Sequence, residues 1–431
     1  MDPVVLARIQ FAMTIGFHFL FPPITIGLAW LLVIVETRAW RTGDPRWERI
    51  GRLFAKLLAL TFAVGVATGV VMEFQFGTNW GEYSKYVGDI FGAPLAAEAI
   101  FAFFMESTFI GLYLFGRGKV SKGVHWFSVV MIAVGSTISA FWILVANSWQ
   151  QTPAGYILGD GRVELASFSE AVFTPSMWPR FFHTLDAALI SGAFFMAGIA
   201  AYFLWRKRDA ADDDAHSDAG LARVALVLAL VFGFATSLLE LMPFGHWHAQ
   251  QVARTQPEKF AAIEGLYSSS DRAPLVLFGI PAVGDPPELI LPVEIEGMLS
   301  WMAFGDANHP VKGLDQFPKD EIPPLWLTFV SFHNMVVLGM FFIFVTGLGL
   351  VLLWRRKLFT TRWYLKLLTL SIPLPLAACQ LGWITAEVGR QPWAVYRLLR
   401  TADAVSVTVS AGEILASIIM FALIYLCLGG L

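Results

Sequence analysis

Long apolar stretches recur along the whole chain, and nine of them are long enough to cross a membrane. A helix needs about 20 mostly apolar residues to span the hydrocarbon core of a bilayer. The connections between these stretches are shorter and more polar, with one exception of about 80 residues. We therefore expect an all-α, polytopic membrane protein whose nine transmembrane helices lie at about 11–35, 53–75, 94–115, 124–147, 181–205, 221–242, 326–354, 363–387 and 405–430.

The composition agrees with a membrane protein. Hydrophobic residues make up 56% of the chain and charged residues 15%, whereas soluble domains carry about 25% charged residues. The net charge of −3 gives no sign of nucleic-acid binding. Cys379 and Cys427 lie in apolar stretches without the spacing of a metal site or a disulfide framework, so we interpret both as packing residues. The first apolar stretch is long enough to remain as a span, and no cleavable signal is expected.

Lysine and arginine are concentrated in alternate connections. The loops after the first, third, fifth and seventh predicted spans hold more than half of the 30 Lys and Arg residues, Lys207 and Arg208 among them. Short loops rich in these residues stay on the cytoplasmic side. This pattern predicts an N-terminus outside and a cytoplasmic C-terminus.

The long connection divides the chain into three parts. Helices one to six occupy 1–242, an outer loop occupies 243–325, and helices seven to nine occupy 326–431. A loop of this length is usually functional or disordered. Taken alone, the segment could equally be a solvated cap.

Ionisable and metal-ligating side chains within spans are costly, and most are functional. Counted along each span at 1.5 Å per residue, five such residues are expected in the outer half of the membrane. Haem iron takes ligands such as His and Met, so residues at one level could hold several haems. A single span histidine is as often a packing residue, and a span methionine is usually core filler. The candidates are His18, Lys56, Glu98, Glu106, His183, Asp186, Glu240, His333 and Glu387, and the five outer ones are His18, Glu98, His183, Met335 and Glu387.

Two carboxylates on the third span have the spacing of a proton relay. Glu98 and Glu106 are eight residues apart, which is about 12 Å of helix and slightly over two turns, so they are expected to share a face. Buried carboxylates commonly mark proton pathways. The alternative is that Glu106 is protonated and purely structural. Ser139 and Asn147, eight apart on the fourth span, could extend the path or simply contact other helices.

Eight stretches together resemble subunit I of the cytochrome bd quinol oxidases, over nearly the whole chain. Each stretch is modest evidence alone, but their common order is highly specific, and GRQPW is the strongest. They are 8–27 (RIQFAMTIGFHFLFPPITIG), 94–111 (PLAAEAIFAFFMESTFIG), 142–155 (WILVANSWQQTPAG), 181–192 (FFHTLDAALISG), 259–264 (KFAAIE), 277–281 (LFGIP), 331–339 (SFHNMVVLG) and 382–393 (GWITAEVGRQPW).

The resemblance implies three haems. His183 and Met335 match the axial pair of a low-spin haem b, and His18 matches the axial ligand of haem d, with Glu98 beside the haem pair. Glu387 matches the ligand of a high-spin haem b. The sequence leaves open whether the oxygen site holds haem d or a further haem b.

The resemblance also implies a quinol site. Lys259 and Glu264 match residues of the quinol-binding loop, the Q-loop, here in its short form. Arg390 is placed to pair with a haem propionate, or to anchor the end of a helix. Some relatives carry Arg where this chain has His333; two positions from Met335 on a helix, His333 cannot share its face, so we interpret it as a neighbour of the haem or a packing residue.

The expected protein is thus a terminal respiratory oxidase of the bacterial inner membrane. It would oxidise ubiquinol or menaquinol at the outer face, reduce O₂ to water and generate a proton motive force. Expected partners are subunit II, quinol and O₂, with room for a small single-span subunit and no nucleic acid. A haem-copper oxidase is less consistent, because only His18, His183 and His333 lie clearly within the predicted spans. A cofactor-free transporter using buried carboxylates is the rival from another class.

Overall fold

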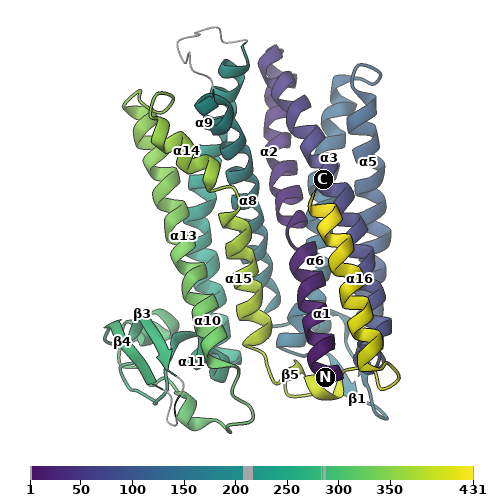
Figure 1. Ribbon diagram of the computed structural model, residues 1–431, viewed down its shortest axis with the longest axis vertical. Coiled ribbons are helices and arrows are strands. Elements are labelled where there is room, and N and C mark those ends of the chain that lie inside the picture. The colour runs from purple at the N-terminus through teal and green to yellow at the C-terminus, as the bar shows by residue number, and fades with distance from the viewer. Residues whose placement is uncertain (1, 207–216, 283, 285–287, 431) are drawn as a thin grey trace.

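The computed structural model describes residues 2–206, 217–282, 284 and 288–430 (Figure 1). These residues contain nine long helical runs. Within these ranges each run is long and apolar enough to span a membrane, which confirms the predicted helical membrane fold. Lys207 and Arg208 lie outside the described residues. The runs, called spans one to nine, are Pro3–Thr42, Pro45–Thr78, Gly81–Gly116, Lys122–Gln151, Met177–Arg206, Asp218–Thr255, Leu325–Trp354, Arg362–Val388 and Ala411–Gly429.

The first eight spans form two bundles that stand side by side (Figure 1). Helix α16 (Ala411–Gly429) packs on α1 at the edge of the first bundle. The first bundle contains α1 (Pro3–His18), α2 (Phe21–Thr42), α3 (Pro45–Thr78), α4 (Gly81–Ala97), α5 (Phe104–Gly116) and α6 (Lys122–Gln151), and the second contains α8 (Met177–Arg206), α9 (Asp218–Leu239), α13 (Leu325–Trp354), α14 (Arg362–Leu370) and α15 (Leu374–Val388).

The bundles meet where α2 crosses α8, and two glycines make that contact close. A Cβ added at Gly27 would lie 2.3 Å from the carbonyl oxygen of Ala188, and one at Gly192 would lie 2.3 Å from the carbonyl carbon of Gly27. Small residues let membrane helices approach to backbone contact. These two positions therefore set the distance between the bundles.

Several spans are interrupted rather than continuous, which the hydropathy pattern did not predict. Span one breaks after His18, because Pro22 and Pro23 cannot donate hydrogen bonds to the carbonyls one turn earlier. Span eight breaks before Pro373. Spans three and six contain π-helical turns at Glu98–Phe103 and Glu240–Gly245, the second with a kink at Met242.

Some helices also extend beyond the predicted boundaries. Span one starts at Pro3, span three at Gly81, and span six continues through α10 (His246–Thr255) past the predicted end at 242. Hydropathy marks the part of a helix that lies in lipid, whereas the helix itself continues into more polar sequence. In consequence, His246 and His248 lie in the helical run of span six, and His125, at the edge of the predicted fourth span, also lies in a helical run.

One end of the molecule carries the N-terminus and the 243–325 segment (Figure 1). After α10, this segment has its own small core around Phe260 and Leu299. The all-α expectation omitted three short antiparallel hairpins among the described residues, all at this end. The elements here are α11 (Pro257–Glu264), α12 (Met298–Phe304), η3 (Leu314–Gln316) and α7 (Phe168–Val172), with hairpins β1 (Tyr156–Leu158) with β2 (Val163–Leu165), β3 (Leu275–Ala282) with β4 (Glu288–Ile295), and β5 (Trp393–Val395) with β6 (Leu399–Arg400).

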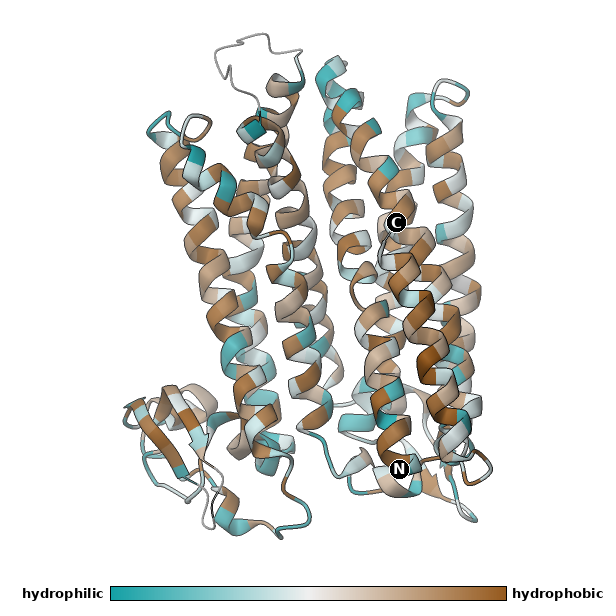
Figure 2. Ribbon diagram, viewed as in Figure 1, coloured by the Kyte–Doolittle hydropathy of each residue, from teal (hydrophilic) through white to brown (hydrophobic). Residues whose placement is uncertain are grey.

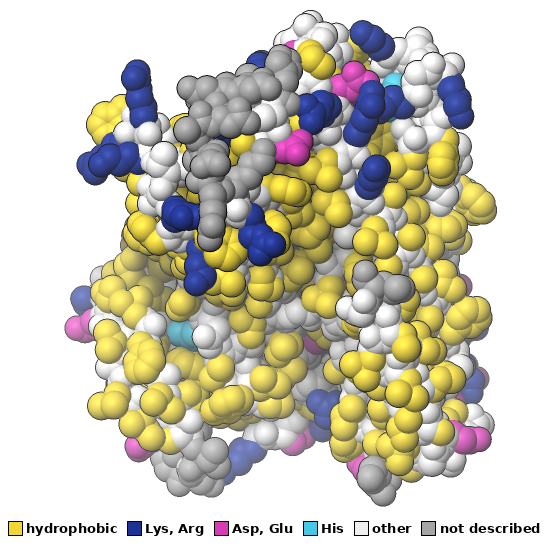
Figure 3. All heavy atoms as spheres, turned by 45° about the horizontal axis from the view of Figure 1, so that its top comes forward, with side chains coloured by type: hydrophobic (Ala, Val, Ile, Leu, Met, Phe, Trp, Pro, Cys, Tyr) yellow, Lys and Arg dark blue, Asp and Glu magenta, His cyan; other side chains and the backbone are white. Residues whose placement is uncertain are grey.

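The opposite end is rich in positive charge. Lys and Arg side chains gather there, while hydrophobic side chains cover much of the molecule below them (Figure 3). The residues along the middle of the helices are mostly hydrophobic (Figure 2). The connections from α2 to α3, from α5 to α6 and from α13 to α14 lie at this end (Figure 1). The molecule therefore has the apolar belt and polar ends of a membrane-spanning protein.

Candidate functional site

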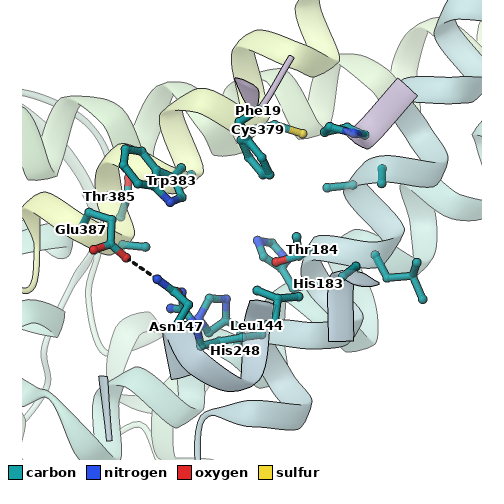
Figure 4. Close-up of a pocket in the computed structure, with 18 of the residues that line it drawn as sticks. Phe19, Leu144, Asn147, His183, Thr184, His248, Cys379, Trp383, Thr385 and Glu387 are labelled. Atoms are coloured by element: carbon teal, nitrogen blue, oxygen red, sulfur yellow. Dashed lines mark hydrogen bonds between the residues drawn. The ribbon is translucent and has the colours of Figure 1, made fainter. Parts of the chain in front are cut away.

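A cavity of about 1430 Å³ lies between the two bundles and extends to the 243–325 segment. All nine site residues predicted from the sequence line it, although they are spread over most of the chain. Part of the cavity is shown in Figure 4, with His183 and Glu387 on facing walls. The nine are His18, Glu98, Glu106, His183, Lys259, Glu264, Met335, Glu387 and Arg390.

His18 lies at the break between α1 and α2, and its ring is held by α3. The His18 Nδ1 atom is 3.0 Å from the hydroxyl oxygen of Thr68. That hydroxyl points its proton at the carbonyls of Val64 and Gly65, at 2.9 and 3.0 Å, so toward His18 it accepts. The Nδ1 atom then carries the proton, and Nε2 keeps a lone pair for a metal.

Gly69 leaves the space in which this ring sits. A Cβ added at Gly69 would come 3.1 Å from His18 Cε1. The α3 helix therefore presents Thr68 to orient the ring and the bare backbone of Gly69 to accommodate it.

His183 faces the cavity from α8, with a carboxylate behind its ring. The Oε1 atom of Glu240 lies 3.1 Å from His183 Nδ1, and the His248 ring is 5.1 Å from the His183 ring, edge to face. The π turn that begins at Glu240 carries this carboxylate. This close approach is not a hydrogen bond, because His183 Nδ1 has no hydrogen-bond partner among the described residues, but it leaves Nε2 as the ring nitrogen on the side away from Glu240.

Met335 approaches from α13 toward a bare stretch of α15. A Cβ added at Gly382 would lie 2.8 Å from the Met335 sulfur, so any larger residue there would displace the thioether. His333 is directed elsewhere: its Nε2 lies 3.1 Å from the carbonyl oxygen of Val276 on β3, and its Nδ1 lies 3.0 Å from that of Phe329. As the helical spacing predicts, His333 and Met335 do not share a face.

Glu387 is the centre of a polar cluster at the ends of α6 and α15. Its Oε1 accepts a hydrogen bond from Asn147 at 2.9 Å (Figure 4), and its Oε2 accepts one from Arg390 at 2.5 Å. Arg390 also donates to Gln150 at 2.6 Å. Arg180 of α8 donates to the side-chain oxygen of Asn147.

This cluster holds more buried cations than anions. Arg180, Lys259 and Arg390 are each at most 7% exposed, and of these only Arg390 forms an ion pair with Glu387. The Nε atoms of both arginines are buried without a hydrogen-bond partner in the described parts of the chain. Buried charges require partners, so the site is suited to a further anionic group.

Lys259 and Glu264 enter the cavity from α11. The Lys259 ammonium donates to Gln151 and to the carbonyl of Ala386, both at 3.0 Å. Burial, and then the Arg180 charge, lower the pKa of Lys259 well below its usual range. Burial raises the pKa of Glu264 to about 8, and its Oε2 has no hydrogen-bond partner among the described residues.

Glu98 and Glu106 lie on one face, as predicted, but for a different reason. The Glu98 carboxylate accepts a hydrogen bond from Ser139 at 2.7 Å, and a Cβ at Gly135 would lie 2.7 Å from Glu106 Cγ. Both therefore face α6. The π turn between them has more residues per turn than an α-helix, so it cancels the offset that eight α-helical residues would leave.

Four residues that sequence reasoning missed help to build the site. Thr68, Arg180, Gln151 and His248 each contact a predicted residue, but none stands out in its own stretch. Arg180 had a signal: it immediately precedes the apolar run that contains His183. The sequence identifies Glu240 as an ionisable span residue, but it does not predict that Glu240 lies next to His183.

The chemistry of the cavity fits haem. Its histidine, methionine and carboxylate side chains include the usual axial ligands, its walls are largely apolar, and the excess of buried cations suits propionates. Its volume exceeds the roughly 300–1,000 Å³ typical of a single small-molecule site. Fold and site together define a multi-span membrane protein of the cytochrome class.

Comparison with known proteins identifies the family. The model of the cytochrome bd terminal oxidase subunit I family matches residues 6–431, and the chain belongs to this family. Subunit 1 of the cytochrome bd ubiquinol oxidase of Bacillus subtilis (strain 168) is 39% identical, over 100% of this chain and 92% of that protein. Subunit 1 of the cytochrome bd-II ubiquinol oxidase of Escherichia coli (strain K12) is 35% identical, over 98% and 93%.

A solved structure supports the same assignment. The bd oxidase from Geobacillus thermodenitrificans superposes with a TM-score of 0.91 at 31% sequence identity, covering 99% of this chain and 95% of that chain. The chain is therefore a multi-pass subunit of a haem-containing terminal oxidase in the bacterial cytoplasmic membrane. The family excludes both rivals, a haem-copper oxidase and a cofactor-free transporter.

Proposed function

We propose that the protein oxidises quinol at the end that carries the 243–325 segment and reduces O₂ to water in the cavity between the bundles. Two quinols supply the four electrons that one O₂ requires. The observation that carries this proposal is the convergence of His18, His183, Met335 and Glu387 on one cavity with surplus buried cations. Haem, when bound there, supplies one-electron transfer and oxygen chemistry.

Three haems are proposed, each with its own residues. His183 and Met335 hold a low-spin haem b, His18 holds haem d or a further haem b, and Glu387 holds a high-spin haem b. Glu98 lies beside the pair of high-spin haems. The Thr68 contact to His18 and the Glu240 contact to His183 support these roles, because each leaves the ring nitrogen away from the contact for iron.

Arg390 binds a haem propionate in this scheme, and Arg180 is an additional candidate. The contacts of Arg390 with Glu387 and Gln150 leave its Nε free of described partners. Guanidinium groups bind carboxylates in a bidentate geometry, through two parallel hydrogen bonds. The spare donors of both residues are therefore available to propionates.

Lys259 and Glu264 bind quinol, and Glu264 accepts a proton from it. A buried carboxylate whose Oε2 has no described hydrogen-bond partner can accept a proton from a quinol hydroxyl. Lys259 connects this loop to the Glu387 cluster through Gln151 and the Ala386 carbonyl. The 243–325 segment is thus the Q-loop in its short form.

Glu106 and Glu98 supply protons for water formation. Both line the cavity, and Ser139 links Glu98 to α6. By the positive-inside rule we assign the Lys- and Arg-rich end to the cytoplasm, and with that assignment the N-terminus and the quinol site lie outside. Proton uptake from the cytoplasm and release outside then generate a proton motive force. Subunit II is the partner, and a small single-span subunit is an additional one.

The experiment that tests this proposal is the spectrum of the Met335→Leu variant in the purified oxidase. Leucine preserves the volume of the side chain but removes one axial bond, so the low-spin haem becomes high-spin. Trp383→Phe, which keeps an aromatic ring at the cavity wall, is the matched control and should retain the low-spin spectrum. A low-spin spectrum that is unchanged in Met335→Leu would refute this ligand, and a colourless preparation would refute the whole scheme.

A further inference from the structure

The hairpin formed by β3 and β4 exposes an apolar face. Phe278 pairs with Val293, and Ile280 pairs with Ile290; these four side chains are 55%, 54%, 46% and 50% exposed. An antiparallel sheet with one face in water normally carries polar residues on that face. This hairpin instead exposes four apolar side chains, and its strands contain many hydrophobic residues, drawn brown in Figure 2.

The hairpin is attached to a membrane-spanning helix well inside its end. The contact of His333 with the Val276 carbonyl places β3 eight residues, about 12 Å, along α13. With 30 residues, α13 is about 45 Å long, roughly 15 Å longer than the hydrocarbon core. If the excess is shared between both ends, the core begins about five residues into α13. His333, and with it the start of β3, lies beyond that level.

Exposed apolar side chains also lie on the spanning helix that the hairpin contacts. Leu277 on β3 and Val337 on α13 are 52% and 60% exposed, and both line the cavity. Farther along α13, Phe344 is 65% exposed. The hairpin thus lies against a helix that also exposes apolar side chains.

Two tryptophans indicate the depth of this region. Trp326, at the start of α13, and Trp301, on α12 beside β3, are 55% and 53% exposed. Exposed tryptophans are enriched where the bilayer meets water. The hairpin is therefore at the level of the interface and the outermost acyl chains.

The carboxylates of β4 and its end limit how deep the hairpin can lie. Glu288, Glu294 and Glu296 are exposed, and Glu296 pairs with Arg272 at 3.3 Å. Charged groups in hydrocarbon are costly, so these side chains must reach the headgroups or water. A shallow position satisfies both the apolar face and the carboxylates.

We propose that the β3–β4 hairpin is a lipid-binding element, which lies in the leaflet on its side of the membrane with Phe278, Ile280, Ile290 and Val293 against acyl chains. Its partner is phospholipid, not another protein. This inference does not depend on the quinol chemistry, because lipid contact is measured directly.

Photocrosslinking tests this inference in the complete oxidase complex. Phe278 is replaced by p-benzoylphenylalanine, a close analogue, and the complex is reconstituted in vesicles of phosphatidylethanolamine and phosphatidylglycerol. Phe344, on the apolar belt, serves as the lipid-facing reference. Lys312, an exposed residue of the same segment, serves as the water-facing reference. Adducts are identified by mass spectrometry after illumination.

The expected result is phospholipid adducts at position 278 at a yield close to that at 344 and well above that at 312. A yield no higher than at 312, or an adduct with a polypeptide of the partner subunit, would overturn the proposal. Ile290→p-benzoylphenylalanine provides a second position on the same face and is read by the same criteria. An unchanged haem spectrum in each preparation shows that the labelled protein is folded.

Discussion

Thr68 determines which nitrogen of His18 is left without a contact to α3, and in the proposed assignment that nitrogen binds iron. Its hydroxyl accepts from Nδ1 because its own proton is directed at helix carbonyls. We expect Thr68→Val to weaken haem binding at His18 by about 10- to 100-fold, the usual cost of losing such an outer partner. The measurement is haem content per polypeptide, together with the optical spectrum of the oxidase.

The matched control for this change is Thr61→Val on the same helix. Thr61 is buried and accepts a hydrogen bond from Thr25 at 3.2 Å, but it does not line the cavity. If both variants retain full haem content, the orienting role of Thr68 is wrong.

Glu264 gives quinol oxidation a predicted pH dependence. Burial raises its pKa to about 8, so the carboxyl is protonated at lower pH and cannot accept a quinol proton. As the pH rises toward 8, the ionised fraction increases, and kcat/KM for quinol should rise and then level off. Glu264→Gln should lower kcat/KM and remove this rising limb.

The control for Glu264 is Glu288→Gln, a surface carboxylate of the same segment. Its pH profile should match that of the parent protein. A rising limb that persists in Glu264→Gln would assign the titration to another group.

At the scale of elements, the interruptions in the spans coincide with the cavity. His18 ends α1, Glu98 begins one π turn, and Glu240 begins the other. Irregular backbone at membrane depth is tolerated where it is buried in protein or lines a cavity. The breaks thus turn toward the cavity candidate site residues that a regular helix would rotate elsewhere.

The π turn in span three lies between Glu98 and Glu106, and both carboxylates line the cavity. The proposed role of Glu106 as a proton donor can be tested by mutation. We expect Glu106→Gln to slow O₂ reduction and proton uptake while the haems stay bound, because the amide cannot carry a proton along the path. The measurement is charge movement after rapid oxidation of the reduced enzyme. Glu82→Gln, at the start of the same helical run, should behave as the parent, and a wild-type rate and amplitude in Glu106→Gln would remove it from the path.

The sequence predicted the spans well and their interruptions poorly. Hydropathy reports burial in lipid, and all nine spans were found on that basis. The break at Pro22 and Pro23 could have been predicted from the sequence, since proline removes helix hydrogen bonds. The π turn at Glu98 had no such mark, because it depends on packing against Ser139 and Gly135 of another helix. The placement of Arg180 and Gln151 likewise depends on long-range contacts.

At the scale of the whole molecule, the contact between the bundles rests on Gly27 and Gly192. We expect Gly27→Leu to lower the free energy of unfolding by about 1–3 kcal/mol or more. The leucine side chain would overlap the backbone of α8. A lowered Tm of the purified oxidase is the measurement. Gly111→Ala, where a Cβ meets nothing within 4 Å in this chain, should leave Tm nearly unchanged; equal shifts in both variants would argue against a special role for this crossing.

The division of the cavity between the bundles has a consequence for biosynthesis. Its walls include His18 in span one and Glu387 at the end of span eight. A ribosome makes the chain from the N-terminus. Span one, which carries His18, is therefore synthesised long before span eight, which carries Glu387. The closed cavity can form only after span eight has been inserted. On the proposed assignment, in which Glu387 holds a haem, the complete haem set can load only after span eight has been inserted, and chains that stop before span eight cannot acquire that set.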